Sequence, residues 1–334
     1  MEPKKVLLFG VTGQVASFMA DYLLEMGHYV YGVARRTSCD NTKRIKHIID
    51  HPRFKLLSAD ITDATGVNRV FLEVKPDYCF NYASQSHVKV SWDEPSSGVD
   101  SIAKGCLNCL ESIRQHVPKC RYFYASSSEQ FGNSVDLDGY QRMTTPMTPN
   151  SPYAACKVLA HNLTRIYRES YGIFAVCGLS ANQESERRGD NFVTRKITKY
   201  IGKMVAMEKR SMIAPALKLG NTKSFRDWSH PKDFIKAHWL MLQQETPKDY
   251  IISSGDAHSV EEFLTCAFSL VDRNYKDYVV IDPALYRPLE VDYLKLDSTP
   301  LRNELRWKPE IDFKQLVELM VSNDIKEAER EFIK

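Results

Sequence analysis

The first half of the chain alternates short apolar runs with segments of helical periodicity, and this alternation restricts the fold more than any other feature. Five nearly unbroken apolar runs read KVLLFG, YVYGVA, FKLLSAD, YCFNYA and RYFYAS. Amphipathic segments such as FMADYLLEM and VNRVFLEV separate them. A longer helix is expected from about Tyr153 to Tyr171, followed by another strand, FAVCGL. Strands that are apolar on both faces belong in a parallel sheet with helices on either side. We therefore predict an α/β fold with a doubly wound parallel sheet.

The second half of the chain is organised differently. After Asn182 the alternation loosens and basic residues become more frequent, although one more strand-like run, YIISSG, occurs at 250–255. We therefore predict two domains. Residues 1–181, together with about 226–256, are expected to form a Rossmann-type nucleotide-binding domain. Residues 182–225 and 257–334 are expected to form a smaller C-terminal domain that binds the substrate.

Composition argues against several classes of function. The 334 residues carry a net charge of +3, and Lys and Arg are spread along the chain, so nucleic acid is not the expected partner. No apolar run approaches ~18 residues, and the run after MEPKK is too short for a signal-peptide core. We therefore expect no membrane span and a cytoplasmic protein. Cys106 and Cys109 lie within a helical pattern, without a second pair at zinc-finger spacing, so we expect reduced thiols and no metal site.

A glycine-rich turn follows the first expected strand and precedes a helix. It reads Gly10-Val-Thr-Gly13-Gln-Val-Ala16. Glycines here permit a tight turn and let the backbone approach a pyrophosphate at the helix N-terminus, and Ala is tolerated at the third position because it serves helix packing. A plain strand–helix turn is the alternative, but the position at the N-terminus favours dinucleotide binding. The residues of this turn expected to bind the dinucleotide are Gly10, Thr12, Gly13, Gln14 and Val15.

The second expected strand ends in a basic, hydroxyl-rich stretch, Arg35-Arg36-Thr37-Ser38. Sites that prefer NAD usually place a carboxylate here for the ribose 2′-hydroxyl. Two guanidinium groups and two hydroxyls instead suit a 2′-phosphate, because Arg forms paired hydrogen bonds with phosphate oxygens. A solvent-exposed basic turn is the alternative. We predict that the cofactor is NADP.

Tyr153 and Lys157 form the only Tyr-x-x-x-Lys pattern in the chain. On a helix this spacing places both side chains on one face, one turn apart. A fixed ammonium group stabilises tyrosinate and lowers a pKa that is otherwise about 10, so that the phenol can act as a base near neutral pH. A surface Tyr–Lys pair is the ordinary alternative. Ser151-Pro152 precedes the pair at a plausible helix start, which favours catalysis.

These motifs together resemble those of the extended short-chain dehydrogenase/reductases. Longer matches are more specific and occur in order along almost the entire chain: NYASQSHVKVSW, YASSSEQFG, SPYAACK, NQESERRGDNFVTRKI, LGNTKSFRDW, YRPLEVDYL and LRWKP. With these matches the chain resembles the GDP-mannose 4,6-dehydratase family. The resemblance implies an NADP-dependent lyase that acts on GDP-mannose in deoxysugar synthesis.

The resemblance assigns the catalytic roles. Glu129 matches the base that removes the C5 proton and helps to expel the C6 hydroxyl, and Ser127 stands where the family has Thr or Ser. Ser128 occupies a position that is Asp in dehydratases of dTDP-glucose, which favours the GDP-mannose branch. Tyr153 and Lys157 match the pair that oxidises C4.

The resemblance also implies the residues that bind the two ligands. Cofactor-binding positions, besides those in the glycine turn, the basic stretch and the Tyr–Lys pair, are Asp60, Ile61, Tyr82, Ala83, Ser84, Gln85, Ser86, Gln183 and Arg188. Substrate-binding positions are Ser86, Ser127, Glu129, Asn182, Val193, Lys196, Arg226, Arg287 and Glu290. Asp60 has a second interpretation, as a helix cap. The chain departs from the family at Val15-Ala16, at Gln183, which replaces a His, and in a shortened stretch at 91–100.

Two further properties follow from the resemblance. The stretch RRTSCDNTKR matches a tetramer contact, so a homodimer or homotetramer is expected. The alternative enzyme is a dehydratase or 4-dehydrogenase of a related GDP-sugar such as a GDP-heptose, because the motif residues do not distinguish these sugars. A catalytically silent NADP-binding protein is the alternative from another class, but the presence of Ser127, Glu129, Tyr153 and Lys157 disfavours it.

Overall fold

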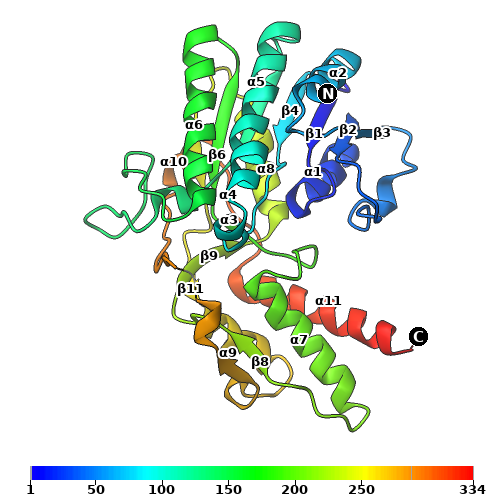
Figure 1. Cartoon of the computed structure of the whole chain (residues 1–334), viewed down its shortest axis with the longest axis vertical. Coiled ribbons are helices and arrows are strands. Elements are labelled where there is room, and N and C mark those ends of the chain that lie inside the picture. The colour runs from blue at the N-terminus through cyan, green and yellow to red at the C-terminus, as the bar shows by residue number, and fades with distance from the viewer. Residues whose placement is uncertain (1, 287, 334) are drawn as a thin grey trace.

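Seven parallel strands form the central sheet of the computed structural model, which describes residues 2–286 and 288–333 (Figure 1). The strand order is β10-β6-β5-β4-β1-β2-β3. The strands are β1 (Lys5–Phe9), β2 (Tyr29–Ala34), β3 (Phe54–Ser58), β4 (Tyr78–Asn81), β5 (Arg121–Ser127), β6 (Ala175–Ser180) and β10 (Tyr250–Ile252). Every pairing between neighbours in this sheet is parallel. The predicted fold class is therefore confirmed, and each strand coincides with an apolar run named above, with β5 and β6 extending one residue beyond theirs.

Helices cover both faces of the sheet. On one face α1 (Gln14–Glu25) packs beside α8 (Pro231–Leu242), and on the other α2 (Ala64–Val74), α5 (Gly105–His116) and α6 (Pro152–Tyr171) lie side by side (Figure 1). Cys106 and Cys109 are buried free thiols within α5. The short elements of this part are η1 (Lys46–Ile48), α3 (Val90–Asp93), α4 (Pro95–Gly98), the π-helical η2 (Val99–Lys104), η3 (Ser128–Phe131) and α10 (Thr299–Leu305).

The turn after β1 makes a close approach to the end of β4. Gly10 has a φ of +78°, and a Cβ atom there would lie 2.9 Å from the backbone nitrogen of Ala83. Only glycine fits both the left-handed backbone and the contact. β1 and β4 are the neighbouring strands at which the strand order reverses, which is where sheets of this type bind ligands.

Helix α6 is fixed at both ends by local sequence. Its N-cap, Ser151, accepts a hydrogen bond from the Ala154 N–H at 3.1 Å, and Pro152 occupies the first helical turn. Gly172 ends the helix in the left-handed conformation, with φ of +65°. This helix therefore starts where Ser-Pro predicts it and holds Tyr153 in its first turn.

A second hydrophobic cluster lies below the sheet in the view of Figure 1. It is built from α7 (Val193–Glu208), α9 (Val260–Ser269) and α11 (Phe313–Ile333), with residues of β8 (Leu217–Leu219) and β9 (Phe225–Ser229). A Cβ atom at Gly202 would clash with the carbonyl oxygen of Asp324, so the backbones of α7 and α11 lie close together at this point. The remaining elements are β7 (Asn182–Gln183), β11 (Ala257–Ser259), η4 (Tyr275–Asp277), β12 (Val279–Ile281) and η5 (Pro283–Leu285).

Two stretches pack across the predicted domain boundaries. β9 forms a three-stranded sheet with β7 and β11, and its Trp228 belongs to the second cluster. Residues 296–307 contribute Leu296, Leu301 and Trp307 to the core of the large sheet. The division into two domains at those boundaries stays a prediction. Within the described ranges, none of the helices combines the length and the apolar character needed to cross a membrane.

Candidate active site

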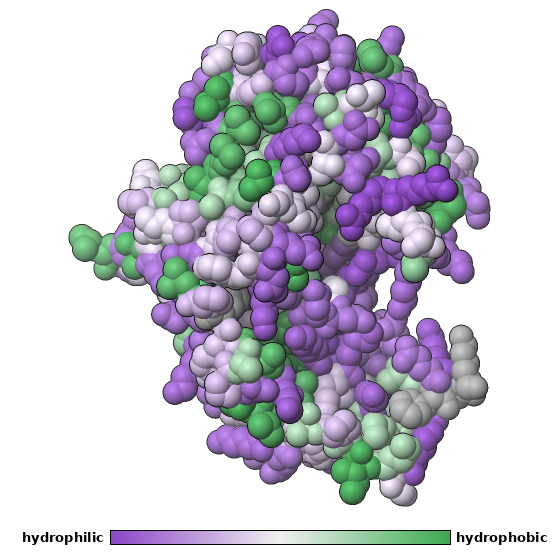
Figure 2. All heavy atoms as spheres, in the orientation of Figure 1, coloured by the Kyte–Doolittle hydropathy of each residue, from purple (hydrophilic) through white to green (hydrophobic). Residues whose placement is uncertain are grey.

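A cavity of about 1170 Å³ lies between the carboxyl ends of the sheet strands and the α7–α9 part of the molecule. Cavities that bind one small ligand usually measure about 300–1,000 Å³, so this one has room for a dinucleotide and a second ligand. Figure 2 shows hydrophilic side chains gathered across the middle of this face, where the two parts of the molecule meet. The cavity therefore lies where the sequence motifs converge.

Most of the predicted site residues line this cavity. They are Gly10, Thr12, Gly13, Gln14, Val15, Arg35, Thr37, Asp60, Ile61, Tyr82, Ala83, Ser84, Gln85, Ser86, Ser127, Glu129, Tyr153, Lys157, Asn182, Gln183, Arg188, Val193, Lys196, Arg226 and Glu290. Arg36 and Ser38 are exposed and do not line it. Arg287 lies outside the described residues.

The first turn of α1 faces the cavity without a side-chain cap. Gly13 is its N-cap, and no side chain accepts a hydrogen bond from the first turn. Gln14 does not serve as a cap, because its Nε2 donates to the Gln183 carbonyl at 2.8 Å and its Oε1 accepts from the Ser185 hydroxyl at 2.7 Å. Uncapped N–H groups at the positive end of a helix dipole suit a pyrophosphate.

Two buried amide oxygens provide a second test of whether the cavity suits a dinucleotide. Gln85 and Gln183 line the cavity, and the side-chain oxygen of each has no hydrogen-bond partner within the described part of the chain. Buried acceptors are normally satisfied, so such atoms need a donor from a ligand or from water. The glycine turn, the bare helix start and these acceptors together fit a nicotinamide dinucleotide.

The basic stretch after β2 divides into two parts. Arg35 and Thr37 line the cavity, whereas Arg36 and Ser38 do not. Arg44 also lines it, and donates to the carbonyls of Thr12 at 3.1 Å and Arg187 at 2.6 Å. Arg44 thus ties the glycine turn to the 184–188 loop.

Asp60 does not cap a helix. Its carboxylate accepts hydrogen bonds from the backbone N–H and the hydroxyl of Thr62, at 2.9 and 2.8 Å. The N-cap of α2 is Asp63, which accepts from the N–H groups of Thr65 and Gly66. The interpretation of Asp60 as a cap is therefore wrong, and its place in the cavity wall remains.

The sequence YASSSEQFG turns sharply at the end of β5. Ser127 is the N-cap of η3, and its hydroxyl accepts from the Glu129 N–H at 3.3 Å. Glu129 is 7% exposed, and its carboxylate lies 3.8 Å from the Arg226 guanidinium. The turn therefore buries a carboxylate beside a cation at the carboxyl end of the sheet, where ligands bind in such folds.

Tyr153 and Lys157 lie on the same face of α6, as their spacing predicts. Lys157 Nζ donates to the Ala125 carbonyl at 2.7 Å and lies 5.7 Å from the centre of the Tyr153 ring. Burial raises the pKa of Tyr153 to about 12, although a hydrogen bond with Ser127 acts in the opposite direction. Burial also lowers the pKa of Lys157 to about 8. In the protein without ligands the pKa of Tyr153 is therefore raised and not lowered as expected, because desolvation outweighs the hydrogen bond with Ser127.

Arg188 is held in the cavity wall by two neighbours. Its Nε lies 3.1 Å from the carboxylate of Glu184, and its guanidinium stacks 3.4 Å from the centre of the Phe192 ring. Glu184 is buried, and desolvation raises the pKa of its carboxyl group. Val193 and Lys196 follow in the first turn of α7, whose N-terminus has no side-chain cap. This side of the cavity therefore offers cations and free backbone donors to a second anionic ligand.

Sequence comparisons decide the relationship. Residues 7–320 match the family model described as GDP-mannose 4,6 dehydratase. GDP-mannose 4,6 dehydratase 2 of Arabidopsis thaliana is 44% identical over 343 residues, which cover 99% of this chain and 90% of the relative. The human GDP-mannose 4,6 dehydratase is 37% identical over 350 residues, which cover 97% and 92%.

The chain belongs to the GDP-mannose 4,6-dehydratase family.

Solved structures of other enzymes share its fold. The dTDP-glucose 4,6-dehydratase of Bacillus anthracis, in complex with NAD, superposes with a TM-score of 0.83 at 21% identity and covers 97% of both chains. RMD from Pseudomonas aeruginosa, complexed with NADPH, gives a TM-score of 0.79 at 20% identity and covers 97% of this chain and 100% of that one. At this level of identity, the likeness concerns the fold.

Among the residues of the cavity wall that the sequence motifs missed in this member of the GDP-mannose 4,6-dehydratase family are Arg44 and Glu184. Arg44 lies in the RRTSCDNTKR stretch, which drew attention only as a subunit contact. Glu184 lies inside the NQESERRGDNFVTRKI match, four residues before Arg188 in a non-helical stretch, where no spacing rule pairs the two side chains. The contacts of Arg44 join segments far apart in sequence.

The lowered pKa of Lys157 predicts a pH-dependent contribution to stability. The pKa of Lys157 is about 8 in the folded protein, below its ordinary value of 10.5. Between about pH 8 and 10.5 the unfolded chain therefore keeps a proton that the folded chain has released. Stability from this group therefore rises with pH. The free energy of unfolding of the wild type should increase relative to Lys157→Met by about 1–2 kcal/mol between about pH 7.5 and 9.5.

Denaturant titration at each pH measures this difference. Lys203→Met, at an exposed position of α7, is the control and should follow the wild-type profile. Parallel profiles for wild type and Lys157→Met would contradict the prediction.

Proposed function

We propose that this protein converts GDP-mannose to GDP-4-keto-6-deoxymannose, eliminating water with the help of a bound nicotinamide cofactor. The observation that carries the proposal is the placement of Glu129 in the same cavity as Tyr153 and Lys157. Oxidation of a sugar hydroxyl requires only the Tyr–Lys pair, whereas elimination requires a further base. Membership of the family whose relatives carry this name supports the same reaction.

In this proposal each polar side chain has one task. Tyr153 accepts the proton of the C4 hydroxyl, and Lys157 and Ser127 hold its phenol in place. The cofactor, when bound, accepts a hydride from C4 and later returns it to C6. Glu129 removes the C5 proton, which the 4-ketone has made acidic, and passes a proton to the departing C6 hydroxyl. The proton taken from C4 balances the one that C5 regains, so the cycle needs no external acid or base.

The resting pKa values fit a site that is activated by its ligand. Burial holds Tyr153 in its neutral form, with a pKa of about 12. An oxidised nicotinamide ring carries a positive charge, and an opposite charge nearby favours the ionised phenol. The protein would thus acquire an effective base only when the oxidised cofactor is present.

Substrate binding is assigned to the α7 side of the cavity. Lys196 and Arg226 provide cations, and the uncapped first turn of α7 provides backbone donors for a diphosphate. Asn182 and Glu290 line the same region and offer polar contacts to a base or sugar. The pyrophosphate of the cofactor is assigned to the other bare helix start, that of α1.

GDP-mannose deuterated at C4 tests the reaction. With wild-type protein, deuterium should appear at C6 of the 4-keto-6-deoxy product, as read by NMR and mass spectrometry. Glu129→Gln should oxidise C4 but leave deuterium on the reduced cofactor, with turnover reduced about 10²–10⁴-fold. Glu94→Gln, which alters another carboxylate of the cavity wall, is the control and should behave as wild type. A wild type that leaves C6 free of deuterium, or a Glu129→Gln that turns over normally, would contradict the proposal.

We propose NADP as the preferred cofactor, because Arg35 and Thr37 follow β2 on the cavity wall where NAD sites usually carry a carboxylate. Arg35→Ala should weaken NADP⁺ binding about tenfold or more and leave NAD⁺ binding unchanged, since it removes a charged hydrogen bond to the 2′-phosphate. Arg36→Ala is the matched control, because Arg36 does not line the cavity. Titration of both nucleotides by fluorescence would measure the effect. Equal losses for the two nucleotides would favour NAD.

We also propose a homodimer or homotetramer. Arg36 and Ser38 match the family's subunit contact, and both are exposed outside the cavity. Size exclusion with light scattering should give twice or four times the mass of one chain. A stable monomer would contradict this assignment.

A further inference from the structure

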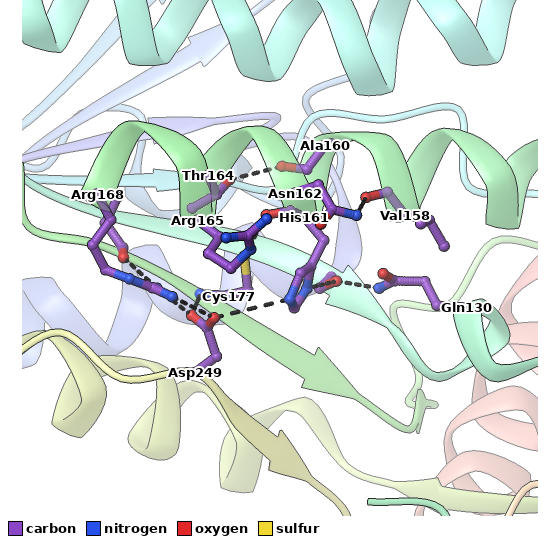
Figure 3. A network of polar contacts seen from close by, with 12 residues as sticks. Gln130, Val158, Ala160, His161, Asn162, Thr164, Arg165, Arg168, Cys177 and Asp249 are labelled. Atoms are coloured by element: carbon purple, nitrogen blue, oxygen red, sulfur yellow. Dashed lines mark hydrogen bonds and ion pairs between the residues drawn. The ribbon is translucent and has the colours of Figure 1, made fainter. Parts of the chain in front are cut away.

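A chain of buried polar side chains lies behind the Ser127–Glu129 turn, between β5 and α6 (Figure 3). Ser126, Gln130 and His161 are 6%, 0% and 5% exposed. Gln130 and His161 do not line the cavity. We propose that Gln130 and His161 are positioning residues, which hold this turn so that Glu129 can transfer protons. The proposal rests on the function proposed above.

Gln130 joins the turn to the strand. Its Nε2 donates to the Ser127 carbonyl at 3.0 Å and to the hydroxyl of Ser126. Ser126 in turn lies 3.3 Å from His161 Nδ1. His161 is two helical turns beyond Tyr153 and one beyond Lys157, on the same face of α6. The helix that carries the Tyr–Lys pair therefore also supports the residues that precede Glu129.

The chemistry of the donors and acceptors indicates a direction for the hydrogen bonds that link Gln130, Ser126 and His161. A carbonyl oxygen can only accept, so the nitrogen of the Gln130 amide must face Ser127. The same nitrogen donates to the Ser126 hydroxyl, whose own proton is then available to His161 Nδ1. The carboxylate of Asp249 lies on the Nε2 side of the ring, which favours the neutral tautomer that carries its proton on Nε2. Burial lowers the pKa of His161, which favours the neutral ring although Asp249 opposes this effect.

At its other end, this network of polar side chains contacts an ion pair between Asp249 and Arg168. His161 Nε2 lies 3.9 Å from the carboxylate of Asp249. Arg168 donates to both oxygens of Asp249, at 2.8 and 3.0 Å, and also to the Ala175 carbonyl. The Cys177 N–H donates to the same carboxylate at 2.6 Å. The carboxylate is therefore fixed to α6 and β6, and the His161 ring packs against an immobile partner.

The alternative for this cluster is a metal site, because His161, Cys177 and Asp249 present ligand atoms within 4.8 Å of one another. Both oxygens of Asp249 already accept hydrogen bonds from Arg168. Burial raises the pKa of the Cys177 thiol well above its ordinary value, so the thiolate that a metal prefers is disfavoured. The guanidinium adds a positive charge at the same place. These contacts favour a hydrogen-bonded support over a metal ligand set.

The support matters because η3 is a single short turn of four residues. Lys157 donates a hydrogen bond to the Ala125 carbonyl. Gln130 and His161 both contact the Ser126 hydroxyl. Gln130 also donates to the Ser127 carbonyl. The three consecutive residues 125–127, which precede Ser128 and Glu129, are thus held by these contacts. A displacement of about 1 Å at a reacting group can lower a rate about 10²-fold, so loss of this support should affect elimination more than substrate binding.

Rapid-mixing experiments that follow reduced nicotinamide test the proposal. When the protein with bound NADP⁺ meets GDP-mannose, the reduced cofactor should appear and decay as elimination proceeds. Gln130→Met, which removes the amide but keeps the volume, should slow the decay about 10–100-fold with little change in the rate of appearance or in KM. His161→Leu should do the same. His161→Gln should restore the decay, because an amide can accept from Ser126 and reach towards Asp249.

Asn162→Ala is the matched control, since Asn162 is the next residue on α6 and, within the part of the chain that the structure describes, its side chain donates one hydrogen bond, to the Val158 carbonyl of its own helix. It should behave as wild type. Unchanged decay in Gln130→Met, or equal slowing of appearance and decay together with a lower Tm, would overturn the positioning role. If the wild type itself transfers no deuterium from C4 to C6, the proposed function fails and this inference fails with it.

The tautomer of His161 offers a test that needs no variant to fold. NMR spectra of the intact protein carrying isotope-labelled histidine should show a neutral His161 ring protonated on Nε2. A ring protonated on Nδ1 would donate to the Ser126 hydroxyl and would overturn the order of hydrogen bonds assigned to these residues.

Discussion

The 2.7 Å hydrogen bond from Lys157 to the carbonyl of Ala125 joins the helix that carries Tyr153 to the strand that leads into Glu129. The two bases of the proposed reaction come from separate segments, and this contact fixes their relative positions. A charged donor inside a buried site is costly unless it is hydrogen-bonded. The ammonium group of Lys157 is buried at the end of β5, and the lowered pKa of Lys157 reflects the cost of that burial.

Burial also acts on the phenol of Tyr153. A tyrosine with a pKa of about 12 is a poor base near neutral pH. In the proposed reaction the positive charge of an oxidised nicotinamide offsets this effect, whereas the starts of α1 and α7, on either side of the cavity, serve to bind anionic groups. Both helices start without a side-chain cap, so their backbone donors are available to anions.

Sequence alone predicts the large sheet well, because each of its strands is an apolar run and α6 is marked by Ser-Pro at its start. The smaller sheets are harder to predict. β7, β8 and β11 have two or three residues each, too few for any periodicity, and β9 (FRDWS) is not an apolar run. The position of Glu129 in the cavity follows from local sequence, since it comes directly after a strand. The electrostatic state of Tyr153 does not, because desolvation depends on everything that covers it.

Sequence motifs also do not predict contacts between segments that are far apart in the sequence. Gln130 is adjacent to a predicted catalytic residue, but His161, which it reaches through Ser126, lies in a helix, and the anchor Asp249 comes from much later in the chain. No spacing rule links these positions. Arg44 presents the same problem, since its two hydrogen-bond acceptors belong to segments on either side of it.

The close approach of the two backbones at Gly202 and Asp324 has a consequence for the order in which the site is made. α7 carries Val193 and Lys196 on the cavity wall, but it packs against α11, close to the C-terminus. During synthesis, domains form as their segments emerge, and six of the seven strands of the large sheet are complete before residue 182. A growing chain therefore contains six of these strands well before α7 has its support, although α8, β10 and residues 296–307, which complete the core of the large sheet, also come later. Until α11 is made, the cavity wall that carries Val193 and Lys196 lacks the helix against which it packs.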